Sequence, residues 1–304
     1  MTWPRAVQRL AGAALVVVAM IPAPLRAAEP SDVGTQRDPV EAAPDGPASP
    51  WPSDAPVSWK QVGADAHYLF ARPAHLDKMG WTKLAVGLGV GAALYLVRKD
   101  VRDYAQRHGD GSVDQLLDDA RLMGRTATPL LAAGAFYISG KARDSQYDKE
   151  TSSLILENLA FASAITGVAQ RVVATERPRH GDAIDYFSPP GGHSVSGDVT
   201  VAASMLAPII DRHLQTDADD GRGVRFWKHF GAIGLYGMAG LVAAQRVNAD
   251  AHWLPDVYFG YLNGLAVGRI LVDSRRGGRA WRDERRARRV EVQASVSGLQ
   301  ISWR

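Results

Sequence analysis

The sequence predicts an all-α protein folded as a helical bundle. Its apolar segments are rich in Ala, Leu and Gly, and their lengths suit helices rather than strands. Helix breakers separate them, because Asp110-Gly111 and Pro178 interrupt the apolar pattern, and Pro255 suits the first turn of a helix. In addition, Val290 to Trp303 alternate apolar and polar residues, which predicts a short C-terminal β-hairpin. We expect helices at residues 81–98, 113–123, 127–141, 152–176, 196–213, 228–246 and 255–273.

The first 56 residues precede the helical part and differ from it in composition. Residues 1–28 have a basic start, an uncharged run from Leu10 to Leu25, and the small residues Ala27 and Ala28, as in a secretory signal peptide. A membrane anchor is the alternative for the same run. Residues 29–56 contain seven prolines and many small polar residues, which predicts a disordered linker.

The helical domain is expected over residues 57–275, a length that suits one domain. The chain has no cysteine, which excludes disulfides, thiol catalysis and cysteine metal sites. An exported protein of this composition must therefore depend on its core for stability.

An arginine-rich tail, residues 276–304, follows the domain. Residues 275–289 carry eight arginines and a net charge of +6, whereas the whole chain carries +3, so the basicity belongs to the tail. Such a tail can bind anionic lipid headgroups, at about 1 kcal/mol per basic residue near a membrane. It can also be a solvated helix, with Glu284 four residues before Arg288. Because export separates the chain from nucleic acid, we expect no nucleic-acid partner.

Three short motifs lie at the borders of the apolar segments. Arg177-Pro178 closes one segment, Pro190-Gly191-Gly192-His193 opens the next, and Arg246, His252 and Asp256 follow in the order Arg-x5-His-x3-Asp. Arginine suits the binding of phosphate, and a histidine oriented by a carboxylate suits nucleophilic attack. The two arginines argue for an anion rather than a metal cation in this site.

The order of these motifs resembles the type 2 phosphatidic acid phosphatase superfamily, which includes bacterial acid phosphatases and vanadium haloperoxidases. The pattern of that superfamily is Lys-x6-Arg-Pro, then Pro-Ser-Gly-His, then Ser-Arg-x5-His-x3-Asp. The resemblance covers roughly residues 150–270 and implies the helical core of these enzymes.

The resemblance also implies a role for each matched residue. His252 attacks phosphorus, His193 protonates the leaving group, and Asp256 accepts a hydrogen bond from the other ring nitrogen of His252. Arg177 and Arg246 bind the phosphate oxygens. Gly191, Gly192 and Gln170 complete the phosphate-binding set, and neither a metal nor another cofactor is expected.

Three positions depart from the superfamily pattern, because Gln170 replaces the lysine, Gly191 replaces one serine and Gln245 replaces the other. A neutral Gln170 lacks the charge of the lysine, and the loss of one donor of this kind lowers rates by about a hundred- to a thousandfold. Arg171 or Arg179 are candidates to replace that charge. Arg171 points about 100° away on the helix, whereas Arg179 lies nearer the site. A glycine loop at 191–192 can offer backbone N–H groups instead of a hydroxyl.

The expected function is that of an exported, metal-independent phosphatase that uses a phosphohistidine intermediate. Its substrate would be a lipid phosphate or pyrophosphate, or a small phosphomonoester. The departures leave open a non-catalytic relative that binds an anion or a lipid, and a vanadate-dependent haloperoxidase is a third alternative. The longest uncharged runs, 84–97, 126–140 and 230–245, are shorter than the roughly 20 residues that cross a bilayer. They predict a periplasmic bundle that lies against a membrane rather than an integral membrane protein.

Overall fold

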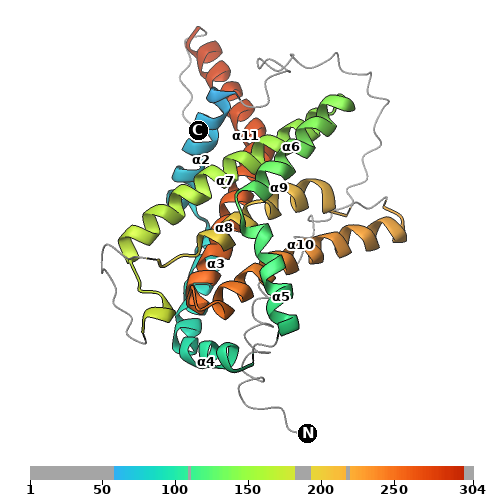
Figure 1. Ribbon diagram of the computed structural model, residues 1–304. Coiled ribbons are helices and arrows are strands. Elements are labelled where there is room, and N and C mark those ends of the chain that lie inside the picture. Colours follow the sequence, from blue (N-terminus) through green and yellow to red (C-terminus); the bar gives the residue numbers. More distant parts are fainter. Residues whose placement is uncertain (1–57, 109–110, 182–192, 217–219, 298–304) are drawn as a thin grey trace.

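The computed structural model describes residues 58–108, 111–181, 193–216 and 220–297, with side chains along the last helix as far as Arg275 (Figure 1). These residues form helices and no β-strand, which confirms the all-α prediction. The predicted signal peptide and linker lie outside the described residues.

The helices follow the apolar segments of the sequence, and two further helices, α2 and α4, lie before and after the first predicted one. Most predicted bounds are met within a few residues. In chain order the elements are α2 Trp59–Ala71, η1 Arg72–His75, α3 Lys78–Leu96, α4 Arg98–His108, α5 Gly111–Ala120, η2 Arg121–Gly124, α6 Ala127–Ala142, α7 Gln146–Val173, η3 Pro178–His180, α8 Gly197–Ser204, α9 Leu206–Ile209, η4 Ile210–Leu214, α10 Arg222–Asn248 and α11 Leu254–Ser297.

Helix α7 carries the first motif to the site and begins six residues earlier than predicted. Ser145 caps its N-terminus, because the Ser145 hydroxyl accepts a hydrogen bond from the Asp148 N–H. The helix ends at Ala174, whose φ of 45° lies in the left-handed region and whose N–H still bonds to the Gln170 carbonyl. The chain therefore turns away before it reaches Pro178.

The predicted helix at 196–213 is broken into α8, α9 and the π-type turn η4. Pro208 accounts for the break, because proline has no N–H to bond to the Ser204 carbonyl four residues earlier. The side chain of Asn158 on α7 satisfies that carbonyl instead, at 2.5 Å. The same amide bonds to the Gly264 carbonyl on α11 at 3.0 Å, so one buried side chain joins three helices.

A buried carboxylate, which the sequence did not indicate, anchors helix α2 to α11. Asp65 is fully buried and accepts hydrogen bonds from Ser274 at 2.7 Å and from Arg275 at 3.2 Å on α11. The prediction of a hairpin over residues 290–303 is wrong as far as Ser297, because α11 remains helical to that point. The Arg- and Ala-rich segment before it has high helix propensity and continues a helix that is already formed.

Helix α11 runs through the centre of the bundle and packs against α7, α8, α9, α2 and α3 (Figure 1). Glycines allow its closest approach to α8. A Cβ atom at Gly260 would lie 2.6 Å from the Ser196 carbonyl oxygen, and one at Gly264 would lie 2.6 Å from the Thr200 carbonyl oxygen. The largest core cluster lies where α8, α9, α10 and α11 meet, around Val199, Leu206, Val242 and Leu265.

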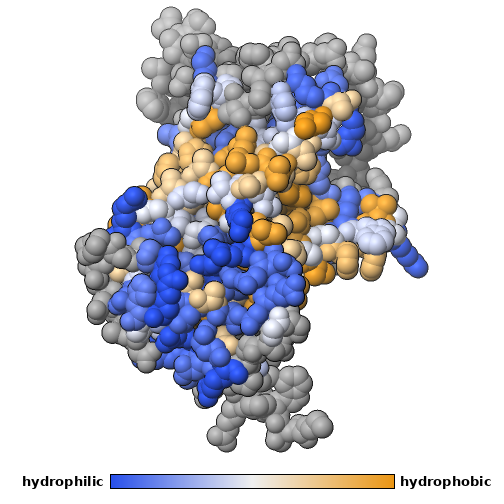
Figure 2. All heavy atoms as spheres, viewed as in Figure 1, coloured by the Kyte–Doolittle hydropathy of each residue, from blue (hydrophilic) through white to orange (hydrophobic). Residues whose placement is uncertain are grey.

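An apolar belt crosses the middle of the molecule, between a charged half that contains α4 and polar residues at the other end (Figure 2). Two helices, Lys78–Leu96 and Gln146–His180, are long and apolar enough to cross a membrane, and the first is mostly exposed. We define the belt by the exposed large apolar side chains of α3, α6, α7 and α10, namely Trp81, Leu84, Val86, Leu88, Leu130, Leu131, Ile138, Val168, Val172, Phe226, Trp227, Phe230 and Ile233.

The contact between α8 and α11 predicts a large effect of Gly264→Ala. The added methyl group would meet the Thr200 carbonyl and the Ala203 side chain, so we expect a loss of about 1–3 kcal/mol of stability. Thermal unfolding followed by circular dichroism measures this. Gly63→Ala is the control, because a Cβ there meets open space and should stabilise α2 slightly. Equal melting temperatures for the two variants would contradict the close contact.

Candidate active site

The ends of four helices meet at one end of the bundle and bring the three motifs together. The His193 N–H donates to the Thr175 carbonyl at 2.9 Å, which joins the loop before α8 to the segment after α7. The Ser196 N–H donates to the Asp256 carbonyl at 3.0 Å, which joins the start of α8 to the start of α11. Two helix N-termini therefore open toward the same place, where their dipoles favour an anion.

A tight turn after α10 fixes His252 relative to Arg246. The N–H groups of Ala251 and His252 both donate to the Arg246 carbonyl, at 3.1 and 3.3 Å. Asp250 has a φ of 53° in this turn, and its carboxylate receives two hydrogen bonds from Arg102 on α4, at 2.6 and 2.7 Å. Helix α4, which the sequence did not predict, thus supports the segment that carries His252.

Asp256 approaches His252 but is not hydrogen-bonded to it. The distance from Asp256 Oδ2 to His252 Nδ1 is 3.9 Å, which is longer than a hydrogen bond. The same carboxylate oxygen accepts the Trp253 N–H at 3.0 Å, as a residue in the first turn of a helix commonly does. The expected bond to Nδ1 is therefore absent from this empty site, although both residues are buried and adjacent.

Arg177 and His193 lie side by side. One terminal nitrogen of the Arg177 guanidinium lies 3.3 Å from His193 Nδ1, although the two residues belong to different motifs. Arg177 immediately precedes η3, whose proline fixes the direction of the chain. The structure thus brings together a cation and the histidine that the resemblance assigns to proton transfer.

Residues outside the motifs hold Arg246 in place. Its guanidinium lies 3.4 Å from the Asp198 carboxylate on α8 and donates to the Gln245 side-chain carbonyl at 3.3 Å. The Gln245 amide in turn donates to Asp118 on α5 at 2.9 Å. Gln245, where the family has serine, is therefore a buried positioning residue for Arg246. No motif indicated Asp118 or Asp198, because their roles depend on helix packing.

Gln170 does not present its amide to the two arginines. It donates to the Val195 carbonyl at 2.8 Å, in the loop before α8. Arg171 points elsewhere and bonds to the Gly167 carbonyl of its own helix, as the helical geometry predicts. Gly191 and Gly192 lie outside the described residues, so their assignment to the phosphate stays a prediction.

Several buried polar atoms converge here without a hydrogen-bond partner among the described residues. They are His252 Nδ1, the Nε atoms of Arg177 and Arg246, and the hydroxyl groups of Thr175 and Ser196. Buried polar groups in proteins are nearly always satisfied, so such a cluster indicates room for a ligand. Two arginines and two histidines suit an oxyanion.

Both histidines are held in the neutral form by their surroundings. Burial lowers the pKa of His252 to about 3, and the charges of Arg246 and Arg177 add to that effect. Burial also lowers the pKa of His193, followed by the charges of Arg177, Arg179 and His180. A neutral imidazole keeps the lone pair that a nucleophile requires.

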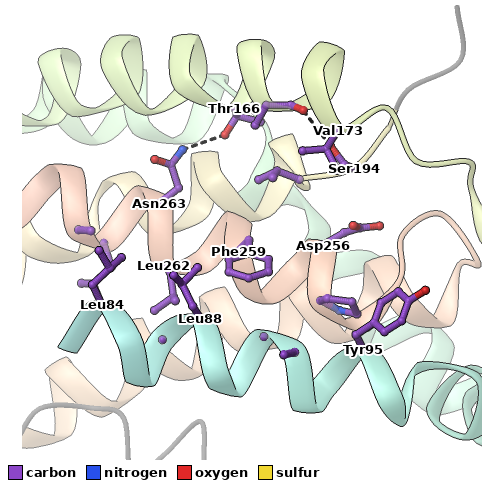
Figure 3. Close-up of a pocket in the computed structure, with 18 of the residues that line it drawn as sticks. Leu84, Leu88, Tyr95, Thr166, Val173, Ser194, Asp256, Phe259, Leu262 and Asn263 are labelled. Atoms are coloured by element: carbon purple, nitrogen blue, oxygen red, sulfur yellow. Dashed lines mark hydrogen bonds between the residues drawn. The ribbon is translucent and has the colours of Figure 1, made fainter. Parts of the chain in front are cut away.

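An apolar groove of about 1060 Å³ begins beside the site and runs between α3, α7 and α11 (Figure 3). Ser194 and Asp256 lie at its inner end, and Phe259 and Leu262 of α11 line it further along. Leu84 and Leu88 line the groove from α3 and also belong to the apolar belt. The groove therefore connects the site with the belt.

Comparison with known proteins gives two similar solved structures. No family model and no curated protein matches the chain. LpxE from Aquifex aeolicus is 14% identical with a TM-score of 0.44, and the match covers 58% of this chain and 95% of LpxE. The first transmembrane phosphatidylglycerolphosphate phosphatase from Bacillus subtilis is 15% identical with a TM-score of 0.44, over 70% of this chain and 94% of the other.

The second structure is a PAP2-type phosphatase.

The charges around His193 predict a titration that responds to anions. We expect the His193 imidazole to titrate below its ordinary pKa in the empty protein, because protonation is opposed by burial and by neighbouring cations. Inorganic phosphate should raise this pKa, because its negative charge favours the imidazolium. Two-dimensional NMR of histidine-labelled protein measures both values, with His193→Gln to assign the signal. A pKa that phosphate leaves unchanged would contradict an anion beside His193.

Proposed function

We propose that this protein is a lipid phosphate phosphatase that works through a phosphohistidine. The observation that carries the proposal is a set of buried nitrogen atoms of Arg177, Arg246 and His252 that have no partner among the described residues, beside an apolar groove that Ser194 and Asp256 line. The cluster suits a phosphate, and the groove suits a hydrocarbon chain. One substrate that contains both parts would occupy both sites together.

In the first step His252 attacks phosphorus and forms an N–P bond. The bond from phosphorus to the leaving oxygen breaks. The negative charge of the bound phosphate raises the pKa of His193, so that His193 is protonated in the complex and gives its proton to that oxygen. Arg177 and Arg246 stabilise the charge on the phosphoryl oxygens. Burial raises the pKa of Asp256 to about 8. The positive charge that develops on the His252 imidazole, 3.9 Å away at Nδ1, favours the carboxylate form of Asp256, which in turn stabilises that charge.

In the second step water attacks the phosphohistidine. His193, now neutral, accepts a proton from the water while the N–P bond breaks. Inorganic phosphate leaves, and the lone pair returns to His252. The protons balance over the cycle, because the proton that His193 gave in the first step is replaced in the second. Charge stabilisation throughout comes from arginine side chains and helix N-termini.

The apolar belt favours a protein embedded in a bilayer over one that only lies against it. Leu131 on α6 is 74% exposed and Phe230 on α10 is 59% exposed. Figure 2 shows apolar side chains gathered in a band across the middle of the molecule. Such a surface is rare on water-soluble monomers and is common where lipid covers it. Uncharged runs shorter than a bilayer do not oppose this proposal, because a helix can carry charges at both ends of an apolar middle. Export through residues 1–28 remains a prediction.

A non-catalytic lipid-binding relative is the second candidate, and one observation favours it. Gln170 replaces the lysine of the pattern and uses its amide on the Val195 carbonyl, so it gives no charge to the site. Such a protein would bind a phosphorylated lipid without hydrolysing it. Activity and its dependence on His252 separate the two candidates.

The test is phosphate release by the purified full chain in detergent micelles that contain EDTA. Phosphatidate, an isoprenyl pyrophosphate and p-nitrophenyl phosphate are the substrates. We expect release to survive EDTA and to fall by at least about 10⁴-fold in His252→Ala, because the nucleophile is lost. His67→Ala on the exposed side of α2 is the control and should leave the rate unchanged. Absence of release from all three substrates by a folded wild-type protein would favour the binding candidate.

The groove predicts a substrate-specific effect of Ala266→Phe. Ala266 lines the groove ten residues along α11 from Asp256, about 15 Å away. A phenyl group there should raise KM for a long-chain phosphatidate by about tenfold or more, through lost apolar burial, and leave p-nitrophenyl phosphate unaffected. Ala135→Phe, on the exposed face of α6, is the matched control. Equal effects on both substrates would mean that the groove does not hold the hydrocarbon chain.

A further inference from the structure

Because glutamine stands at position 170, the site lacks one positive charge that the lysine of the superfamily pattern supplies. The contacts of the nearby arginines indicate which of them can supply it instead. Gln170 is held by the Val195 carbonyl, and it borders a separate polar pocket of about 440 Å³ with Gly197 and Asp198. A substrate phosphate between Arg177 and Arg246 would therefore gain no cation from position 170.

Most of the other arginines near this end of the bundle already have partners. Arg102 forms a double hydrogen bond with Asp250, and Arg121 lies 3.6 Å from the Asp198 carboxylate. Arg98 donates to the Tyr95 carbonyl and stacks on the Tyr95 ring at 3.7 Å. Arg171 bonds to its own helix. Arg102, Arg121 and Arg171 therefore serve the scaffold, whereas Arg98 lines the apolar groove and keeps a buried Nε without a partner among the described residues.

Arg179 differs from these arginines in its position and in the exposure of its side chain. Its N–H donates to the Asp250 carbonyl at 3.3 Å, which docks η3 against the turn that carries His252. Its side chain is exposed and forms no ion pair with the described residues. It thus stands two residues after Arg177, beside the turn that carries His252, with an exposed guanidinium.

The effect of Arg179 on the pKa of His193 agrees with the position of Arg179 beside the site. The positive charge of Arg179 contributes to the lowered pKa of His193, together with burial and the charge of Arg177. It opposes protonation there, so its charge is felt by a residue assigned to the reaction. A cation that opposes the protonation of His193 also attracts an anion that binds beside it.

We propose that Arg179 is the third phosphate-binding cation of this site and replaces the lysine of the superfamily pattern. This inference rests on the proposed function, because it assumes the same phosphate between Arg177 and Arg246. Arg179 binds a phosphoryl oxygen from the open side of the site, where its long side chain can swing onto the ligand. A guanidinium offers a two-pronged contact, which an ammonium does not.

The first experiment measures the affinity for inorganic phosphate by isothermal titration, which needs no turnover. We expect Arg179→Gln to weaken binding by about 10- to 100-fold, the effect of removing one charged contact. Arg179→Lys should retain part of the affinity, because it keeps the charge but loses the fork. Arg171→Gln is the matched control and should bind as the wild type does, because Arg171 faces away from the site.

The second experiment follows the His193 imidazole by NMR in the same variants. Removal of a positive charge should raise the His193 pKa in Arg179→Gln and leave it unchanged in Arg171→Gln. A merely structural role for Arg179 would not produce this shift. Arg179→Lys is the control for misfolding, because lysine preserves the charge and approximately the length of the side chain.

The outcomes separate this inference from the proposed function. Phosphate binding that depends on Arg179, in a wild-type protein without turnover, would support the cation and refute the phosphatase. Normal turnover together with wild-type phosphate affinity in Arg179→Gln would overturn the role of Arg179 and leave the phosphatase intact. An equal loss of phosphate affinity in Arg171→Gln would also overturn the role of Arg179, because the affinity would then depend on the net charge of the protein rather than on a contact with Arg179.

Discussion

The close approach of α8 to α11 is the constraint on which the site depends. Gly260 and Gly264 let the two helices touch through their backbones, and the Ser196 N–H bonds to the Asp256 carbonyl where both helices begin. The two N-termini are thereby held at the same level. A bulkier residue at either glycine would separate the loop that carries His193 from the helix that carries Asp256.

The arginines of the site must also be held in position, because they are cations that lie close together. Arg177 and Arg246 repel each other, so each must be held in place by other contacts. Asp198 offsets part of the charge of Arg246, the chain from Gln245 to Asp118 fixes its position, and its Nε atom is left without a partner among the described residues. The binding energy of a phosphate can then be used on the reaction rather than on ordering side chains.

The sequence was sufficient for the parts of this protein that depend on local pattern. Apolar segments and prolines predicted most helices, and motif order indicated the residues that meet at the site. It was insufficient wherever a partner lies far along the chain. The support of Asp250 by Arg102, the anchoring of α2 by Asp65, and the break at Pro208 compensated by Asn158 all depend on tertiary contacts. The exposure of the belt was also hidden, because hydropathy does not show which apolar faces lack a neighbour.

The length of α11 has a consequence for the two sides of a membrane. The helix starts at the site and continues for 44 residues, a rise of about 66 Å, whereas the hydrocarbon core of a bilayer is about 30 Å thick. Its arginine-rich part begins 22 residues, or about 33 Å, from the first residue of the helix, so in a protein that spans the bilayer it would lie at the headgroups of the opposite leaflet. Anionic headgroups of that leaflet would attract it, so a single helix would join the chemistry on one face to an electrostatic anchor on the other.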